Sequence, residues 1–174
     1  MFKKSFYIFI DFYKSIKIKE LFECVILPLF FTLLTFYIQN TNLSLKNLDL
    51  DYKNSFNDSI LTITSFLIAL SICAITLLFS SSGKNIENAK NKITENRKNH
   101  ENEKISYFQL IQIRSYYNVI LEFLLIILTI IYKLLSNGFN LDVLFYINLF
   151  LIIHILFVLC FVVIHMFHLS WKNE

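Results

Sequence analysis

Four long apolar runs constrain the fold of this sequence more than any other feature. They span residues 21–38, 60–80, 116–135 and 143–167. Each is close to the ~20 residues with which an α-helix crosses the roughly 30 Å hydrocarbon core of a bilayer. Because a segment in lipid must satisfy its own backbone hydrogen bonds, the runs are predicted to be helices. We therefore expect an all-α polytopic membrane protein in which residues 1–174 form a single bundle with four transmembrane helices.

Basic residues are distributed unevenly among the segments that flank these runs. Residues 1–20 contain five lysines, the loop 39–59 contains two, the segment 81–115 contains seven lysines and arginines, and only Lys133 lies near the loop 136–142. Lysine and arginine accumulate on the cytoplasmic side of membrane proteins. We predict that both termini, including the tail 168–174, and the segment 81–115 are cytoplasmic, and that both loops are external. The expected location is the inner membrane of a bacterial cell.

The N-terminal segment 1–20 alternates lysines with apolar and aromatic residues. Phe2, Phe6, Phe9 and Tyr13 recur among its five lysines. Such a pattern is typical of an amphipathic helix in the membrane interface, with aromatic rings at headgroup depth and lysines near anionic lipid. We therefore predict an interfacial helix here, with membrane lipids as its partners.

The segment 81–115 is predicted to form a helical hairpin between the second and third spans. Apolar residues recur at helical spacing on both sides of a stretch, Thr94–Lys104, that is rich in Asn, Lys and Glu. Gly83 is expected to cap the second span, and the second arm should continue into the third. The segment is large enough to dock a soluble protein and too small for an enzyme domain. The candidate contacts with that partner or with lipid are Lys90, Lys92, Arg97 and Lys98.

Small residues form a stripe along the second run, at steps of three or four residues that place them on one helix face. Small residues allow close helix approach in lipid, and hydroxyl groups can bond across the contact. The alternative is that the same hydroxyl groups line a pore. Helix packing is the more general use of such stripes, and an oligomer of this chain is expected in either case. The stripe consists of Thr62, Ser65, Ala69, Cys73, Thr76 and Ser80.

Ionisable residues within or beside the runs form a second set of candidates. In the predicted topology Glu122 and His165 lie at comparable depth on neighbouring helices, where they could sense pH, relay protons or bind a metal. The plainer interpretation is that they pair with each other or with lipid headgroups. His154 differs, because it lies near mid-bilayer, where a polar group needs a partner. The full set is Glu23, Glu122, His154, His165 and His168.

Several functional classes are disfavoured by the sequence. Cys24, Cys73 and Cys160 lie in different runs and form no redox motif. His165 and His168 offer two metal ligands, and a third could come only from a glutamate. The net charge of +3 is modest, and the lysines group by membrane side, so no direct nucleic-acid binding is expected. We predict no enzymatic activity, no cofactor and no metal site.

One stretch resembles a known class of membrane protein. Residues 60–90 contain a small-residue helix that runs into Leu77-Leu-Phe-Ser-Ser-Ser-Gly-Lys-Asn-Ile-Glu-Asn-Ala-Lys. This stretch, and the plan of four spans with a charged segment in the middle, is similar to small four-helix proteins of bacterial antiphage systems. The nearest are the membrane subunit of Kiwa-type systems and the accessory protein of Cas13b-type CRISPR loci. The resemblance implies an oligomeric membrane sensor or effector with a cytoplasmic partner, and it transfers no functional residue.

Three functions follow from these observations, in order of preference. The first is a non-enzymatic membrane sensor or scaffold, in antiphage defence, that recruits a cytoplasmic partner. The second is an oligomeric pore that depolarises the membrane and is lined by the small-residue stripe. The third is a small proton-coupled transporter that uses Glu122 and the histidines.

Overall fold

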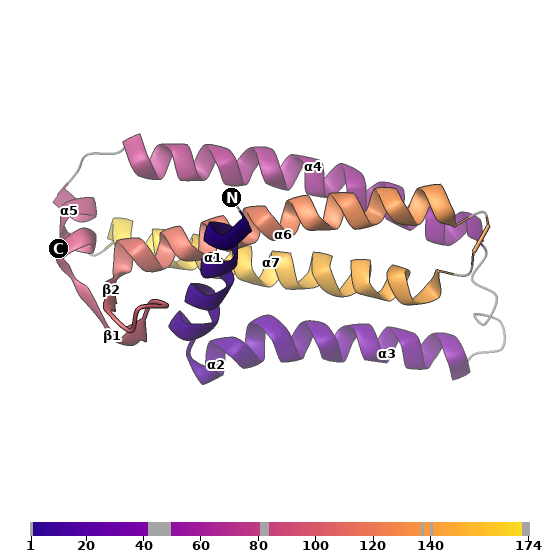
Figure 1. Cartoon of the computed structure of the whole chain (residues 1–174), viewed down its shortest axis with the longest axis horizontal. Coiled ribbons are helices and arrows are strands. Elements are labelled where there is room, and N and C mark those ends of the chain that lie inside the picture. Colours follow the sequence, from indigo (N-terminus) through magenta and orange to yellow (C-terminus); the bar gives the residue numbers. More distant parts are fainter. Residues whose placement is uncertain (1, 42–49, 81–83, 137, 140, 172–174) are drawn as a thin grey trace.

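The computed structural model describes residues 2–41, 50–80, 84–136, 138–139 and 141–171 (Figure 1). Within these ranges four helical segments are long and apolar enough to cross a membrane. Their spans are Ile18–Gln39, Tyr52–Ser80, Tyr107–Leu135 and Asp142–Phe167. The prediction of an essentially helical, multi-pass protein is confirmed at this level.

The long helices lie side by side along the molecule. α6 (Tyr107–Leu135) packs against α4 (Leu50–Ser80) and α7 (Asp142–Trp171), and α3 (Leu27–Thr41) packs on α7 (Figure 1). The centre of the bundle is apolar and closely packed. We call the end of the bundle at which α6 begins the hairpin end, and the opposite end the far end. The main core includes Tyr117, Leu121, Leu125, Ile152, Ile155 and Val158.

The second spanning helix is longer than predicted. α4 begins at Leu50, whereas the sequence predicts an external loop over 39–59 and a helix from residue 60. The first turns of α4 are polar, and hydropathy alone does not detect them. They are stabilised instead by packing on α7, where the Phe56 and Phe145 rings are 5.4 Å apart and Asn148 Nδ2 donates to Asn57 Oδ1 at 3.0 Å. Residues 42–49 lie outside the described residues.

The first spanning helix is composite. It begins as α2 (Ile18–Leu21), continues as a π-helical turn, η1 (Phe22–Ile26), and becomes α3 at Leu27. A π turn widens the helix locally, and such turns occur where the normal hydrogen-bond ladder is interrupted. Pro28 provides the interruption, because proline has no N–H to donate.

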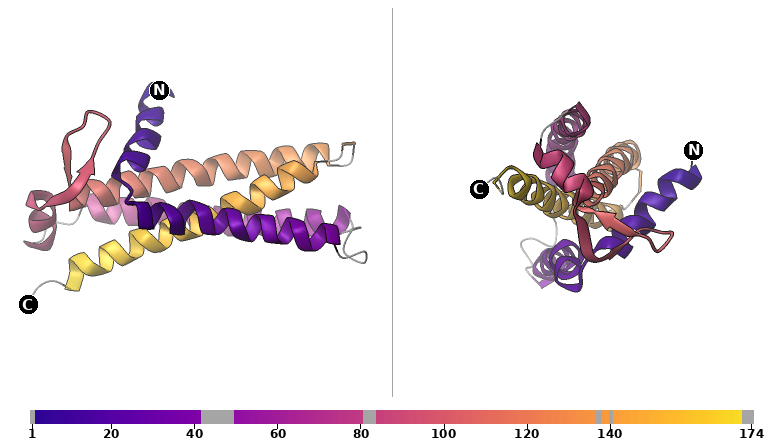
Figure 2. Two further views of the ribbon diagram at one scale, coloured as in Figure 1. Left: turned by 90° about the horizontal axis from the view of Figure 1, so that it is seen from below. Right: turned by 90° about the vertical axis from the view of Figure 1, so that its left-hand side faces the viewer.

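The N-terminal helix α1 (Phe2–Ser15) stands across the long helices rather than along them (Figure 2). Its buried Phe12 stacks on the ring of Tyr117 in α6, with centroids 3.7 Å apart and planes nearly parallel. A helix in this orientation is suited to lie in a membrane surface when the bundle crosses the membrane. The helix is present as predicted, and its placement in the interface stays a prediction.

The segment between α4 and α6 corrects one sequence prediction. Its first arm is helical, as α5 (Lys84–Asn91), but the following residues form an antiparallel β-hairpin from β1 (Ile93–Lys98) and β2 (Lys104–Ser106). The predicted helical hairpin is therefore wrong over residues 93–106, and the predicted cap at Gly83 lies outside the described residues. α6 then begins at Tyr107 and runs without a break into the third span, as predicted.

Asparagine explains why this stretch is not helical. Asn96 and Asn102 have positive φ angles of 59° and 64°, a left-handed conformation that asparagine tolerates better than most residues. Asn99 Oδ1 accepts from the backbone N–H groups of Glu101 and Glu103, at 3.0 and 2.8 Å, and so closes the turn. Ser106 then caps α6, since its hydroxyl accepts from the N–H of Gln109 at 3.2 Å.

Candidate functional site at the hairpin end

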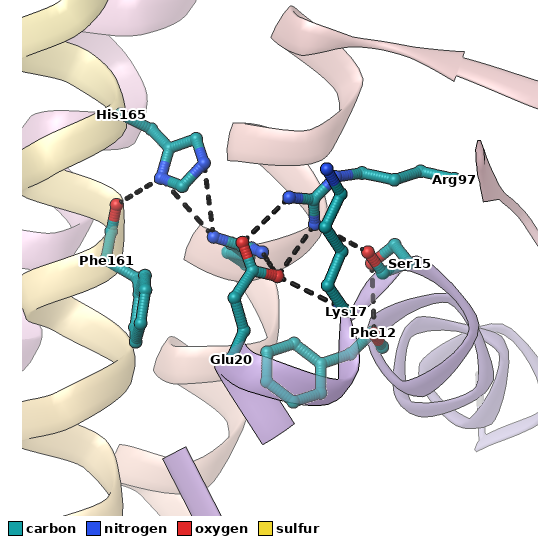
Figure 3. Close-up of polar contacts among 8 residues, drawn as sticks. Phe12, Ser15, Lys17, Glu20, Arg97, Phe161 and His165 are labelled. Carbon is teal, nitrogen blue, oxygen red and sulfur yellow. Dashed lines mark hydrogen bonds and ion pairs between the residues drawn. The ribbon is translucent and has the colours of Figure 1, made fainter. Parts of the chain in front are cut away.

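A single carboxylate, Glu20, lies at the centre of the polar cluster in Figure 3. The chain changes direction between the end of α1 at Ser15 and the start of α2 at Ile18, and Lys17 between them is extended. The N–H of Lys17 donates to Glu20 Oε2 at 3.1 Å, which holds the carboxylate back over the start of the helix. The side chain of Glu20 is largely buried, with 13% of its surface exposed.

Two arginines from distant parts of the chain bind this carboxylate. Arg97 of β1 donates to both carboxylate oxygens, at 2.7 and 2.8 Å, and also to the carbonyl oxygen of Ser15 at 2.7 Å. Arg114 of α6 donates to Glu20 Oε2 at 2.7 Å. Both guanidinium groups are buried, and the two-point contact of Arg97 gives the geometric specificity that lysine lacks.

His165 of α7 completes the arrangement from the other side of Arg114. Its Nδ1 is 2.7 Å from the carbonyl oxygen of Phe161, so Nδ1 carries the proton and donates to that carbonyl. Arg114 Nη1 lies 3.3 Å from Nδ1 and 3.4 Å from Nε2, and with the proton on Nδ1 only Nε2 is free to accept from it. The guanidinium also lies 5.5 Å from the centre of the Phe161 ring. The imidazole is thus neutral in this geometry and orients Arg114 toward Glu20. We call Glu20, Arg97, Arg114 and His165 the Glu20 cluster.

The Glu20 cluster joins four segments, α2, β1, α6 and α7, and the bond from Arg97 to the Ser15 carbonyl adds the end of α1. Its formal balance is one carboxylate against two guanidinium groups, all largely buried. Removing one member of a buried ion pair leaves an uncompensated charge and destabilises a protein by about 3–5 kcal/mol. The position of the hairpin is therefore tied to the position of α1 by a strong and specific contact.

The turn of the hairpin is attached to α1 at a second point. His100 Nδ1 is 2.9 Å from an Asp11 carboxylate oxygen, and the His100 ring stacks on Tyr7 with centroids 4.5 Å apart. Lys14 donates to the carbonyl oxygen of His100 at 3.1 Å and to Asn102 Oδ1 at 3.0 Å. These contacts are more exposed than the Glu20 cluster and contribute less to stability. Lys14 binds the hairpin here, whereas the sequence predicts lysines of this segment near lipid.

His154 lies in a separate polar centre inside the bundle, where it is 2% exposed. Its Nδ1 donates to the carbonyl oxygen of Cys24 at 2.5 Å, and its Nε2 accepts from the hydroxyl of Tyr117 at 2.9 Å. The Tyr117 hydroxyl also lies 3.4 Å from that of Tyr13 on α1. Both ring nitrogens thus have the partners that a polar group at this depth requires.

Glu122 is fully buried in a third polar site between α6 and α4. Its Oε1 accepts from the hydroxyl of Ser71 at 2.9 Å and from the amide of Asn118 at 2.8 Å. The structure does not bring Glu122 and His165 together, because Glu122 bonds to these neutral groups whereas His165 contacts Arg114. A shared carboxylate–imidazole site, one of the sequence-based possibilities, is not formed.

The small-residue stripe faces outward. All six positions on α4 are exposed in the described bundle, and α4 instead packs through Asn57, Ile60, Thr64, Ser71 and Leu78. Packing of the stripe within the chain is therefore contradicted. Three of its hydroxyl groups bond to carbonyl groups four residues earlier in the same helix, so they are satisfied without a partner. These are Thr62, Ser65 and Thr76.

The candidate partner contacts divide into two groups. Lys90, Lys92 and Lys98 are exposed, with Lys90 over the ring of Phe108 and Lys92 over the ring of Tyr107. Arg97 is buried in the Glu20 cluster and has no surface to offer a partner, so its assignment as a contact is corrected.

Two remaining candidates for the intramembrane polar site, Glu23 and His168, belong to none of the polar sites described above. Glu23 is half-buried on η1 and forms no ion pair with any other described residue. His168 lies in α7, and its side chain is outside the described residues.

Several residues that define these sites are not among the candidates predicted from the sequence: Glu20, Arg114, Tyr117 and Asn118. Glu20 and Arg114 lie at the edges of apolar runs, where charges are usually attributed to topology. Pro28 gives a sequence signal for the His154 site, because the carbonyl four residues before a proline needs a donor other than the helix. Polar residues spaced along the third run also indicate a buried polar face.

Comparison with known proteins adds no family assignment, because no protein-family model, curated protein or solved structure matches the chain.

Proposed function

We propose that the protein is a non-enzymatic membrane scaffold with a sensing role, which recruits a soluble partner through α5 and the β-hairpin. The main support is the Glu20 cluster, in which Arg97 of the hairpin binds the Glu20 carboxylate of α2 through two hydrogen bonds and the Ser15 carbonyl at the end of α1 through a third. A displacement of α1 therefore moves or releases the hairpin. In this proposal α1 responds to the membrane surface, and the soluble partner binds the hairpin.

The exposed surface of the hairpin unit suits a protein partner. This unit, α5 together with the β-hairpin, presents exposed charges of both signs, and its β1–β2 ladder rests on α1 and α6 rather than on a domain of its own. Polar rims of this kind give specificity and fast association more than raw affinity. The exposed charged residues of the unit are Lys84, Glu87, Lys90, Lys92, Glu95, Lys98, Glu101, Glu103 and Lys104.

The proposal places the hairpin end in the cytoplasm of a bacterial cell, with the bundle in the inner membrane. The charge distribution supports this orientation, since the most basic flanks meet at that end. The similarity to antiphage membrane proteins supports a role in defence, in which several copies assemble and act with a cytoplasmic protein.

The test is capture of a partner by the full-length protein from membranes of its native host after cross-linking. Wild type is compared with a K92E/K98E double variant, which reverses two exposed charges of the hairpin unit. The control is K19E, which reverses an exposed lysine of α2. We expect one protein to be recovered in constant proportion with wild type and K19E, and lost with the double variant. Equal recovery with all three chains contradicts recruitment by this surface.

A second function, an oligomeric pore, is favoured by the exposure of the hydroxyl stripe on α4. The stripe is available to other copies of the chain, and its Ser65 and Thr76 hydroxyl groups are already bonded within the helix. Liposomes with the purified protein should then conduct ions, and S65L and T76L should change the flux. I63L, on an exposed position outside the stripe, is the control. Unchanged flux in both stripe variants excludes the pore.

A further inference from the structure

Two buried oxygen atoms on α6 have no hydrogen-bond partner: Oε2 of Glu122 and Oδ1 of Asn118. Glu122 is 0% exposed and Asn118 is 1% exposed, and the two residues are one helical turn apart. An unpaired buried acceptor costs about 1–3 kcal/mol, and an unpaired buried charge costs more. Two such atoms, on residues one helical turn apart, are therefore unfavourable unless the protonation state of the site compensates for them.

The two oxygens of the Glu122 carboxyl group are not equivalent. Oε1 accepts two hydrogen bonds, from Ser71 and from the Asn118 amide, whereas Oε2 accepts none. An ionised carboxylate has the same acceptor strength on both oxygens and would be left half unsatisfied. A neutral carboxylic acid matches the pattern, with Oε1 as the carbonyl oxygen and the proton on Oε2. The proton removes the negative charge from the site, so Oε2 is no longer an unpaired charged acceptor.

No cation among the described residues compensates a negative charge at this position. Ser71 on α4 is neutral, the neighbours of Glu122 on α6 are neutral, and the buried cations of the hairpin end are bound to Glu20. The histidines of α7 are engaged elsewhere, with Cys24 and Tyr117 for His154 and with Phe161 and Arg114 for His165. A bound proton is the simplest way to neutralise the site.

Polar residues lead from the hairpin end to Glu122 along one face of α6. Gln112, Ser115, Asn118 and Glu122 follow each other at steps of three, three and four residues, so they share that face. Gln112 and Ser115 also line a narrow groove between α6 and α4, together with Ile75, Leu78, Phe79 and Tyr116. Asn118 and Glu122 lie one and two helical turns beyond Ser115 on the same face, past the residues that line the groove.

We propose that Glu122 is an exchangeable proton-binding site, which holds its proton on Oε2 and exchanges it with water at the hairpin end along Gln112, Ser115 and Asn118. The ligand is a proton, which enters and leaves the site only from the hairpin end of the bundle. It operates independently of partner recruitment, so either property can be lost without the other.

Infrared spectroscopy of the full-length protein in lipid nanodiscs tests the protonation state. The difference between wild type and E122Q should contain the carbonyl stretch of a carboxylic acid at neutral pH. N118L and S71A should each move that band to higher frequency, because each removes one donor from Oε1. A difference spectrum that shows a carboxylate band instead overturns the proposal, as does an acid band that neither variant moves.

Exchange in heavy water tests the route. The acid band shifts when deuterium replaces the proton, and the rate of that shift should fall several-fold in S115L, which places an apolar side chain on the path. Q112L, at the mouth of the groove, provides the same test if S115L does not fold. T129V is the matched control, because Thr129 is buried on α6 beyond Glu122 and its hydroxyl bonds to Leu125 of its own helix. Unchanged exchange in the path variants, or equal slowing in T129V, overturns the route.

Discussion

His154 of α7 donates a hydrogen bond to the main-chain carbonyl of Cys24, four residues before Pro28. In a regular α-helix that carbonyl would accept the N–H of residue 28, which proline lacks. The fourth span thus supplies the donor that the first span is missing. A proline and a histidine that look unrelated in the sequence are two parts of one contact.

Substitution of His154 should therefore destabilise the bundle. H154L removes the donor to the buried Cys24 carbonyl, at about 1–3 kcal/mol, and leaves the Tyr117 hydroxyl with only its longer contact to Tyr13. The measurement is unfolding of the detergent-solubilised protein. In the P28A background the restored N–H of residue 28 can satisfy Cys24, so the same substitution should cost less. Additive effects of P28A and H154L in the double-mutant cycle would show that the two residues are not coupled.

Loss of the Glu20 charge should release the hairpin. E20Q leaves Arg97 and Arg114 without their carboxylate, and the expected loss of stability is about 3–5 kcal/mol. Hydrogen exchange should rise across residues 93–106 and at the start of α6. E101Q is the control, because Glu101 is an exposed residue of the hairpin turn. Exchange rates that E20Q leaves at wild-type values would mean that the Glu20 cluster does not hold the hairpin.

The second attachment of the hairpin should behave differently. D11N weakens only the contact with His100, whose side chain is partly exposed, so the loss of stability should stay below about 1 kcal/mol. Hydrogen exchange should increase in the turn at residues 98–104 and remain unchanged at Arg114. A global increase in exchange would place Asp11 in the same cooperative unit as Glu20, contrary to this expectation.

Association through α4 should be detectable at a native cysteine. Cys73 lies in the outward-facing stripe and is a free, exposed thiol, and Cys160 is an exposed thiol on α7. If copies meet through the stripe, oxidation in membranes should give a covalent dimer with C160A and none with C73A. Dimer formation that depends on Cys160 alone would place the contact on α7.

The sequence predicts the spans well because lipid imposes a simple rule on length and hydropathy. Its errors lie where tertiary contacts override local pattern. The polar first turns of α4 are stabilised as a helix by the hydrogen bond from Asn148 to Asn57. Residues 93–106 form a β-hairpin because Asn96 and Asn102 adopt left-handed backbone conformations. Neither the Asn57–Asn148 hydrogen bond nor the left-handed backbone of the two asparagines produces a periodic pattern of hydropathy.

The candidate sites were less predictable than the fold. The sequence identifies Glu122 and His154 as costly in a membrane, but it does not indicate that Ser71 and Tyr117 are their partners. The small-residue stripe of α4 has the correct periodicity and faces the wrong way for packing within the chain. α4 has two faces that are suited to helix packing, and the sequence does not indicate which of them contacts the other helices of the same chain.

The contact between Glu20 and Arg114 can form only after Arg114 has been synthesised, which fixes its order in the assembly of the protein. The two residues are 94 positions apart, and a ribosome adds about 5–20 residues per second. For roughly 5–20 s after its synthesis, Glu20 has no arginine of the third span to bind. Arg97 lies 77 positions after Glu20 and is therefore synthesised shortly before Arg114. Until both arginines are present, the buried ion pairs that hold the Glu20 carboxylate cannot all form. Complete burial of Glu20 therefore requires a chain that has been synthesised as far as the start of α6, so this contact forms late in the assembly of the bundle.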